Sequence, residues 1–274
     1  MTTAAAHAAM PLGLRLKHRV AVSPLAGPVT GLRRLWARVR GVRHPELGLL
    51  WREDGFIDAA LARLIRQDWT CLDVGGHLGS VAQKLRRLAP KGRLIIVEAS
   101  PAKAALLRKS FPDASVHAVA VSDTEGQVTF YENLAQPGFS SLADRADRGA
   151  TRAITVPARR LDDLLGGTRV QFLKIDVEGF EFPALRGAEA TLRRDAPVIL
   201  FEAGAIGDDC IDAGEADRMM RWLTEVMDHD VFAAFDLSYG RPPLTPELFA
   251  AYRRYPFLAF NYFALPRPGS GHAA

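Results

Sequence analysis

The stretch "LKIDVEGFE", residues 173–181, places charged side chains on a strand whose other positions are apolar. Lys174, Asp176 and Glu178 alternate there with Leu, Ile and Val. A central strand that is buried on both faces should be apolar throughout, and an unpaired buried charge is costly. We therefore expect these three side chains to pair with one another or to open onto a polar cleft. The apolar helix pattern that follows argues against the alternative, a solvated sheet edge.

The chemistry that such a cluster supports is proton transfer. A carboxylate that contacts an alcohol can accept its proton as a new bond forms, which raises the rate about 10²–10⁴-fold. Asp176 and Glu178 are the candidate general bases, and Lys174 would orient or neutralise them. Glu202 ends the next apolar run, "PVILFEA", and should reach the same side of the sheet as a substrate contact. Three carboxylates could also hold a divalent cation, but oxygen ligands at irregular spacing are a weak signal, so no metal site is predicted.

The turn "LDVGGHLGS", residues 72–80, has the composition of a ligand-binding loop between a strand and a helix. It contains three glycines, Gly75, Gly76 and Gly79, which let a ligand approach the backbone because glycine lacks a Cβ. Their spacing differs from the G-x-G-x-x-G of a dinucleotide site. Asp73 precedes the turn, and Glu98 closes the second strand, where an acid reaches ribose hydroxyls in nucleotide-binding α/β folds. These residues favour a nucleoside-bearing cofactor over a purely structural turn.

The elements that would position these residues alternate between strand and helix patterns. The strand patterns are "TCLDVGG", "RLIIVEA", "SVHAVAV", "VQFLKIDV" and "PVILFEA", with helix patterns such as "SVAQKLRRLA" between them. A polar, strand-poor stretch that contains "QVTFYEN" separates the third and fourth strands. This alternation predicts an α/β fold with a mostly parallel central sheet and helices on both faces. We expect "VQFLKIDV" to lie beside the first strand, where ligands bind in open α/β sheets.

Several of these segments occur together in a known family. "DVGGHLG", "VEAS", "AVSD", "RRLDDLL", "LKIDVEGFEFPALRGAEATLRRDAPVILFE" and "NYFALP" stand in the order seen in FkbM-type methyltransferases. The chain resembles this family over roughly residues 46–265. The resemblance implies a Rossmann-like class I methyltransferase fold with an antiparallel strand near the C-terminal edge. It also implies S-adenosylmethionine as the cofactor and O-methylation in secondary metabolism or glycan tailoring.

The resemblance also implies roles for single residues. Asp73, Gly75 and Gly79 would shape the methionine end of the cofactor pocket, Glu98 would hold the ribose diol, and Val121 and Ser122 would border the adenine. The chain departs from the family pattern at Gly76 and His77, where the family usually has Ala-Asn, and at Ala99, where it has Pro. We expect His77 to replace the amide as a hydrogen-bonding cofactor contact. A role in substrate binding or as a base is the alternative.

The sequence therefore predicts an O-methyltransferase that acts on a hydroxyl of a sugar, glycolipid or polyketide-type metabolite by in-line displacement, with a carboxylate base. Two alternatives stay open: an NAD(P)-dependent oxidoreductase, which the glycine spacing disfavours, and a catalytically silent methyltransferase-like module anchored by a basic N-terminal helix. Ser140 and Ser141, in "PGFSSL", are candidate substrate contacts, with simple turn chemistry as the alternative.

Charge is distributed unevenly along the chain. The first 45 residues hold eight Lys and Arg and no acid, which leaves 27 basic and 31 acidic side chains for the rest. The basic balance therefore belongs to an N-terminal extension, residues 1–45, and a nucleic-acid partner is not expected for the methyltransferase domain, residues 46–274. Residues 1–29 are rich in Ala, Gly and Pro, and we expect them to be loosely ordered. Residues 30–43 predict a basic amphipathic helix that could contact an anionic membrane surface or a partner, with packing on the domain as the alternative.

The two cysteines, Cys71 and Cys210, belong to no metal or disulfide motif, so we expect reduced thiols in a cytosolic protein. No apolar run approaches the roughly 18 residues that a membrane-spanning helix needs, and the N-terminus lacks the order of a signal peptide. We therefore expect a cytoplasmic protein with a small-molecule or glycan substrate. Residues 30–43 are the candidate for peripheral membrane contact.

Overall fold

The computed structural model describes residues 12–23, 44–133, 140–142, 150–204 and 214–269. Within these ranges the central sheet has seven strands in the order β3-β2-β1-β7-β8-β10-β9. Their bounds are β1 Cys71–Val74, β2 Leu94–Val97, β3 Ser115–His117, β7 Phe172–Ile175, β8 Val198–Glu202, β9 His229–Ala233 and β10 Asn261–Pro266. The strands run parallel except β10, which pairs antiparallel with β8 and β9. This order confirms the predicted class I methyltransferase fold, and β7 lies beside β1 as expected.

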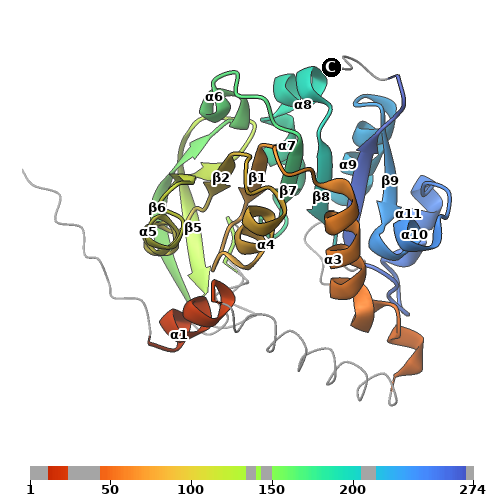
Figure 1. Ribbon diagram of the computed structural model, residues 1–274, viewed down its shortest axis with the longest axis horizontal. Helices are drawn as coiled ribbons and strands as arrows, with labels where there is room; N and C mark the ends of the chain where they lie inside the picture. Colours follow the sequence, from red (N-terminus) through yellow and green to blue (C-terminus); the bar gives the residue numbers. More distant parts are fainter. Residues whose placement is uncertain (1–11, 24–43, 134–139, 143–149, 205–213, 270–274) are drawn as a thin grey trace, which may run out of the picture.

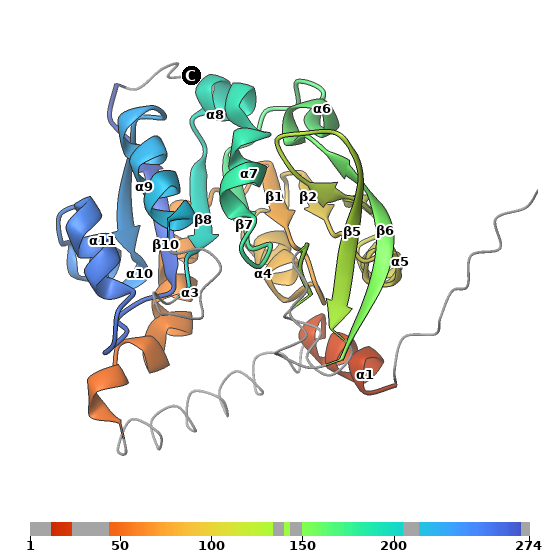
Figure 2. The same ribbon diagram turned by 180° about the vertical axis from the view of Figure 1, so that it is seen from behind.

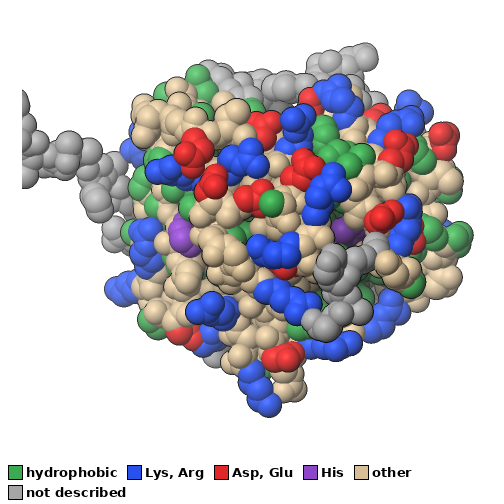
Figure 3. All heavy atoms as spheres, turned by 90° about the horizontal axis from the view of Figure 1, so that it is seen from above, with side chains coloured by type: hydrophobic (Ala, Val, Ile, Leu, Met, Phe, Trp, Pro, Cys, Tyr) green, Lys and Arg blue, Asp and Glu red, His purple; other side chains and the backbone are tan. Residues whose placement is uncertain are grey.

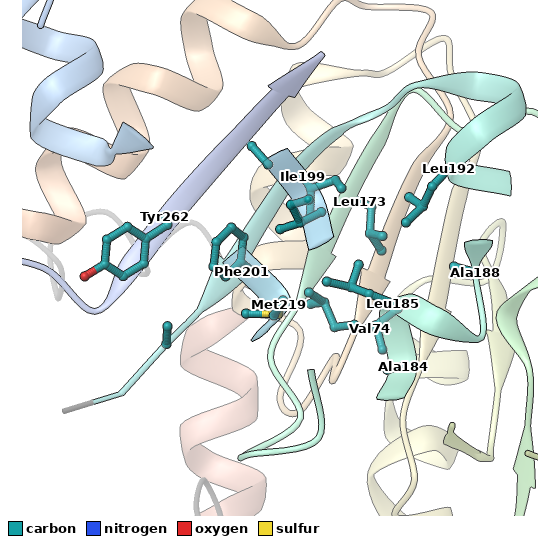
Figure 4. Packing of buried hydrophobic residues seen from close by; sticks show 14 of the residues in the cluster. Val74, Leu173, Ala184, Leu185, Ala188, Leu192, Ile199, Phe201, Met219 and Tyr262 are labelled. Atoms are coloured by element: carbon teal, nitrogen blue, oxygen red, sulfur yellow. The ribbon is translucent and has the colours of Figure 1, made fainter. Parts of the chain in front are cut away.

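Helices cover both faces of the sheet (Figures 1 and 2). The apolar side chains of α3 Glu53–Leu64, α4 Ser80–Leu88 and α5 Pro101–Ser110 form a cluster on one face. Those of α6 Leu161–Leu165, α7 Glu181–Arg186, α8 Glu189–Asp195 and α9 Glu215–Glu225 form a larger cluster on the other. Figure 4 shows this second cluster, in which Leu185 and Leu192 pack near strand residues such as Leu173 and Ile199. The domain also contains α10 Ala234–Tyr239, α11 Pro246–Tyr252 and two 3₁₀ turns, η1 Pro45–Leu47 and η2 Leu50–Arg52.

The alternation of side chains along each strand determines on which face of the central sheet the charged residues lie. Leu72 and Val74 of β1 belong to the cluster of α6–α9, whereas Cys71 belongs to the cluster of α3–α5. Because successive side chains point to opposite faces, Asp73 takes the same face as Cys71. Lys174 of β7 is the register partner of Asp73 and therefore lies beside it. The two charged residues are thus neighbours on the face that α3–α5 cover.

A second, three-stranded sheet follows the third strand pattern. It consists of β4 Ala120–Val121, β5 Gly126–Asn133 and β6 Thr151–Arg159 in the order β4-β6-β5. The predicted single strand "SVHAVAV" is therefore wrong, because it is divided between β3 in the central sheet and β4 in this one. The expectation of a strand-poor stretch is also wrong for β6, whose largely exposed first half lacks an apolar face that would show in the sequence. β5 and β6 pair antiparallel over eight residue pairs, and β4 and β5 contribute residues to one wall of the site described below.

The N-terminal extension contains a helix where loose order was expected. Helix α1, Leu12–Ala21, lies beyond the carboxyl ends of the parallel strands in both views (Figures 1 and 2). His18 on this helix is only 4% exposed, because its ring packs against the domain. The predicted basic helix over residues 30–43 lies outside the described residues, as does Cys210.

Glu53, the first residue of α3, joins the start of the domain to its last strand. Its carboxylate accepts hydrogen bonds from the N–H groups of Phe260 and Asn261, both at 2.8 Å, and from Nδ2 of Asn261 at 3.0 Å. Burial raises the pKa of Glu53 above its ordinary value. Three donors on one buried carboxylate fix α3 against the start of β10.

The face over the amino ends of the parallel strands carries charges of both signs. Figure 3 shows Lys and Arg side chains interspersed with Asp and Glu on this face. A surface of mixed sign does not create the strong single-sign potential that attracts a polyanion. Within the part of the chain that the structure describes, no helix combines the length and apolarity needed to cross a membrane.

Candidate functional site

A pocket of about 220 Å³ opens at the carboxyl ends of β1, β2, β4 and β7. This is the edge of the sheet where open α/β folds bind ligands. The predicted site residues that line it are Gly75, Gly76, His77, Glu98, Val121, Ser140, Lys174, Asp176 and Glu178. Asp73, Gly79, Ser122, Ser141 and Glu202 lie outside its lining. The residues predicted from the sequence thus lie on both sides of one pocket. Several of them lie behind the residues that line it.

The turn after β1 can be built only with glycine at two positions. Gly75 has a left-handed φ of +76°, and a Cβ there would lie 1.9 Å from the carbonyl oxygen of Asp176. A Cβ on Gly76 would lie 2.4 Å from Cγ2 of Ile96. Gly79, with a φ of +82°, is the residue before α4 and packs against Phe111. The turn after β1 and the turn after β7 therefore touch through their backbones, which brings the two predicted halves of the site together.

Glu98 is held by backbone donors at the end of β2. It is 5% exposed, and its Oε2 accepts from the N–H of His77 at 2.8 Å while its Oε1 accepts from the N–H of Ser100 at 2.9 Å. Each carboxylate oxygen has two lone pairs, so both can accept a further hydrogen bond. Glu98 also lines the pocket, so it can accept from a pair of ligand hydroxyls while it remains fixed by the protein.

His77 lies in the same turn in a strained conformation, with a φ of +46°. Burial, together with the positive charge of Lys103, lowers the pKa of His77 to about 3. Its buried Nε2 has no hydrogen-bond partner among the described residues. A ring with so low a pKa is a very weak base, which favours the predicted role of His77 as a hydrogen-bonding contact over the role of base.

Lys174 links the two halves of the pocket. Its Nζ donates to the carbonyl oxygens of Val74, at 3.2 Å, and Gly75, at 3.0 Å. It also forms ion pairs with Oδ1 of Asp73 at 3.5 Å and Oδ2 of Asp176 at 3.3 Å. Burial alone would lower the pKa of Lys174, but these two carboxylates raise it above its ordinary value. Lys174 is therefore charged and holds a fixed place between the two aspartates.

The two aspartates have different surroundings. Asp73 is completely buried, and its pKa is raised by that burial despite the neighbouring Lys174. The side chain of Asp176 is 36% exposed and lines the pocket. Asp176 can therefore meet a ligand directly, whereas Asp73 acts on the pocket through Lys174. The cofactor contact that the resemblance implies for Asp73 stays a prediction.

Glu202 ends β8 behind Asp176. Burial raises the pKa of Glu202 well above its ordinary value, and the charges of Asp176 and Glu178 add to the effect. Its carboxyl group also contacts the side chain of Asp176 by a hydrogen bond. The raised pKa favours the protonated form of Glu202, in which the carboxyl group donates the hydrogen bond to the Asp176 carboxylate.

Glu181 is a site residue that the sequence reasoning missed. Its buried carboxylate accepts from the N–H groups of Val177, at 2.8 Å, and Gly179, at 3.1 Å. Burial raises the pKa of Glu181 to about 7. Glu178, between those two donors, has a left-handed φ of +54°. Glu181 thus closes the turn that carries Asp176, and an acid in the first turn of a helix was the signal that could have identified it.

The outer wall of the pocket comes from the second sheet. Phe130 of β5 and Leu142 add apolar surface beside Val121, and neither was predicted. Ser140 lines the pocket, whereas the hydroxyl of Ser141 donates to the carbonyl oxygen of Glu178 at 2.8 Å. The structure therefore gives Ser141 a place in the scaffold that joins this wall to the turn after β7.

Ser122 turns away from the pocket. Its N–H donates to the carbonyl oxygen of Arg159 at 3.1 Å, and its hydroxyl donates to Asp123 at 3.4 Å. Lys103, from the first turn of α5, takes part in the lining instead and was not predicted. In the described ranges, no group of three or more His, Cys, Asp and Glu side chains is arranged to hold a metal ion.

The family model of the methyltransferase FkbM domain matches residues 73–229, more than half of the chain. The chain belongs to the FkbM methyltransferase family. This match confirms the predicted family and favours a methyltransferase over the oxidoreductase alternative. It begins at Asp73 and spans the glycine turn, the second sheet and the strands that carry Lys174 and Glu202.

Similarity to individual proteins is more distant. Methyltransferase 1 of Beauveria bassiana is 27% identical over 145 residues, which cover 43% of this chain and 57% of that protein. The antimetabolite synthetase AmbE of Pseudomonas aeruginosa is 24% identical over 226 residues, which cover 66% of this chain and 10% of AmbE. The crystal structure of an FkbM methyltransferase from Methylobacillus flagellatus is similar with a TM-score of 0.45 and 15% identity, over 73% of this chain and 44% of that one. The chain therefore spans only part of the length of each of these proteins.

Proposed function

We propose that this FkbM-family chain is an S-adenosylmethionine-dependent O-methyltransferase. Its acceptor is a hydroxyl of a sugar, glycolipid or polyketide-type metabolite. The observation that supports this proposal best is the position of Asp176, a partly exposed carboxylate that lines the pocket and is paired with a buried lysine. A carboxylate in this position can serve as the base that an alcohol acceptor needs.

The residues present fit S-adenosylmethionine. The glycine turn offers close backbone approach where a Cβ would clash, and the unpartnered Nε2 of His77 lies beside it. Glu98 has free acceptor capacity for a ribose diol. Val121 and Phe130 supply an apolar slot on the far side for a planar base. Bound there, the cofactor would supply an electrophilic methyl group on a sulfonium.

Asp176 would remove the proton from the acceptor hydroxyl. Lys174 fixes the Asp176 carboxylate by its ion pair and prevents it from rotating away from the pocket. Glu202 hydrogen-bonds to Asp176, and its raised pKa favours the neutral form, which avoids a second negative charge beside the base. Correct placement of the acceptor accounts for much of the rate, because alignment alone can contribute about 7–11 kcal/mol.

Glu178 lies beside Asp176 and is the second candidate for contact with the acceptor. Its backbone is fixed by the hydrogen bond from Ser141, so its side chain leaves the turn in a defined direction. Ser140 faces the same space from the second sheet. We propose that these two residues help to bind the acceptor. Cytoplasmic location and peripheral membrane contact through residues 30–43 remain predictions.

The test is transfer of an isotopically labelled methyl group from S-adenosylmethionine to fractionated metabolites and glycolipids. We expect label in an ether-linked methyl group with the wild-type chain. In Asp176→Asn, turnover should fall about 10²–10⁴-fold, the contribution of a general base, with nearly unchanged affinity for S-adenosylhomocysteine.

Asp68→Asn is the matched control, because Asp68 is exposed and lies before β1 at the opposite end of the sheet. It should behave like the wild type in both measurements. Label in an amine or a carbon atom would overturn O-methylation, and absence of any binding of S-adenosylhomocysteine would favour the silent module. Equal loss of binding and turnover in Asp176→Asn would show that Asp176 is a cofactor contact instead of the base.

A further inference from the structure

Helix α1 reaches the turn that carries the cofactor contacts. His18 lies in the N-terminal extension, yet its ring contacts residues 60 and 92 positions further along the chain. Nδ1 is 2.9 Å from the carbonyl oxygen of Leu78, and Nε2 is 2.7 Å from the hydroxyl of Ser110. Because a carbonyl oxygen can only accept, Nδ1 carries the proton and donates to Leu78. In the neutral ring Nε2 accepts from Ser110.

Leu78 belongs to a turn in which His77, a residue other than glycine, has a strained left-handed backbone. Its neighbour His77 and the glycines at 75 and 79 all have positive φ angles. Strained backbone persists only where the surrounding structure fixes it. The domain supplies such contacts on one side, where the N–H groups of Gly75 and Gly76 donate to the carbonyl oxygen of Val97. The hydrogen bond from His18 to Leu78 supplies a contact on the other side.

A residue of α1 also interacts electrostatically with His77, which lines the pocket. The charge of Lys17, next to His18, is among the effects that lower the pKa of His77, although burial is the largest. His77 lines the pocket with a buried ring nitrogen that has no partner among the described residues. A small rotation of the turn would move this nitrogen relative to a ligand, so the contact at Leu78 controls the orientation of a pocket group.

We propose that α1 is part of the cofactor site and that His18 is a positioning residue, which holds the turn of residues 75–79 in its ligand-binding form through the carbonyl oxygen of Leu78. The inference rests on the proposed function, because it assigns a residue to that cofactor site. It also gives the N-terminal extension a role at the pocket that is independent of any membrane contact.

Two conservative substitutions separate the contacts of the His18 ring. In His18→Asn, the amide nitrogen takes the place of Nδ1 and keeps the hydrogen bond to Leu78. In His18→Gln, the amide reaches the place of Nε2 and keeps only the contact with Ser110. His18→Ala loses both, and Arg19→Ala, at an exposed position of the same helix, is the control.

Calorimetry with S-adenosylhomocysteine on the full-length chain measures the outcome. We expect His18→Ala and His18→Gln to bind about five- to tenfold more weakly, as for the loss of one hydrogen bond, and His18→Asn and Arg19→Ala to bind like the wild type. Wild-type affinity in His18→Ala would overturn the inference and leave the proposed function intact. Equal affinities of His18→Asn and His18→Gln would overturn it even if His18→Ala failed to fold. A wild-type chain that does not bind the ligand would overturn the proposed function, and the inference with it.

Discussion

The two halves of the pocket are built by different physical means. In the glycine-turn half, residues 75–79 and Glu98, the shape depends on the backbone: positive φ angles, close approach of chains and a carboxylate held by N–H donors. In the acidic half, Lys174, Asp176 and Glu202, the lysine and Asp176 form an ion pair at 3.3 Å, and the two carboxyl groups are joined by a hydrogen bond. The first half is fixed by steric fit, and the second by a balance of charges.

This difference determines how each half should respond to substitution. A change in the glycine-turn half alters the space for a ligand, so affinity should suffer most. A change in the acidic half leaves a buried charge without its counterpart, so the folded state itself should suffer. The predictions that follow test this division, beginning with the largest expected effect.

Lys174→Met should destabilise the protein by about 3–5 kcal/mol, because it leaves Asp73 and Asp176 without their shared cation in a buried site. Denaturant unfolding measures this change. The control is Lys84→Met, which removes a partly exposed ion pair with Asp58 near the surface and should cost at most about 1 kcal/mol. Similar losses in both variants would show that the acidic half does not depend on charge balance.

Gly75→Ala should weaken binding of S-adenosylhomocysteine at least about a hundredfold, or roughly 2.8 kcal/mol. A methyl group at this position would occupy the space of the Asp176 carbonyl oxygen and would require a left-handed alanine. Calorimetry provides the measurement. Gly55→Ala in α3, where a Cβ meets nothing within 4 Å, should bind normally. Unchanged affinity in Gly75→Ala would show that steric fit does not determine ligand binding in the glycine-turn half.

Glu181→Gln should change the pH dependence of stability. A folded-state pKa of about 7, above the ordinary 4.5, means that the folded protein binds this proton more tightly than the unfolded chain. The stabilisation is therefore complete below pH 4.5 and is lost as the pH rises towards 7. Linkage gives a loss of about 2 kcal/mol between pH 5 and 7.

The glutamine variant cannot titrate, yet its amide oxygen can still accept from the turn. Its free energy of unfolding, measured at several pH values, should therefore fall less steeply over this range than that of the wild type. Glu189→Gln, on the surface of α8, should retain the wild-type slope. A variant slope equal to the wild-type slope would show that Glu181 is ionised throughout.

The sequence predicted more of the glycine-turn half than of the acidic half. The glycine spacing and the acid at the end of β2 are local features. The residue types alone therefore indicate a turn that a ligand can approach closely. Lys174 and Asp176 were also identified, because charge on a buried strand contradicts its environment. What the sequence did not reveal was the pairing of Lys174 with Asp73, which depends on the register between β1 and β7.

The residues that the sequence missed depend on contacts between distant segments. Phe130 and Leu142 reach the pocket only because β5 and β6 fold over it as a second sheet, and β6 is too exposed to show a strand pattern. The sequence did not single out Glu181, because its role arises from two backbone donors in the preceding turn. His18 was assigned to a loosely ordered leader, since nothing near it in the sequence indicates a partner 60 residues away.

The contact between Glu53 and the start of β10 has a practical consequence for anyone who shortens this chain. Asn261 is the register partner of Glu202, so the carboxylate of Glu53 supports the strand edge beside Glu202 and Asp176. A shortened chain that begins after Glu53 would lose the hydrogen bonds that hold the start of β10, more than two hundred residues further along the chain. This loss would disturb the position of the neighbouring strand end that carries Glu202. Trimming from the N-terminus should therefore stop upstream of α3 to preserve the fold, and upstream of α1 to preserve cofactor affinity.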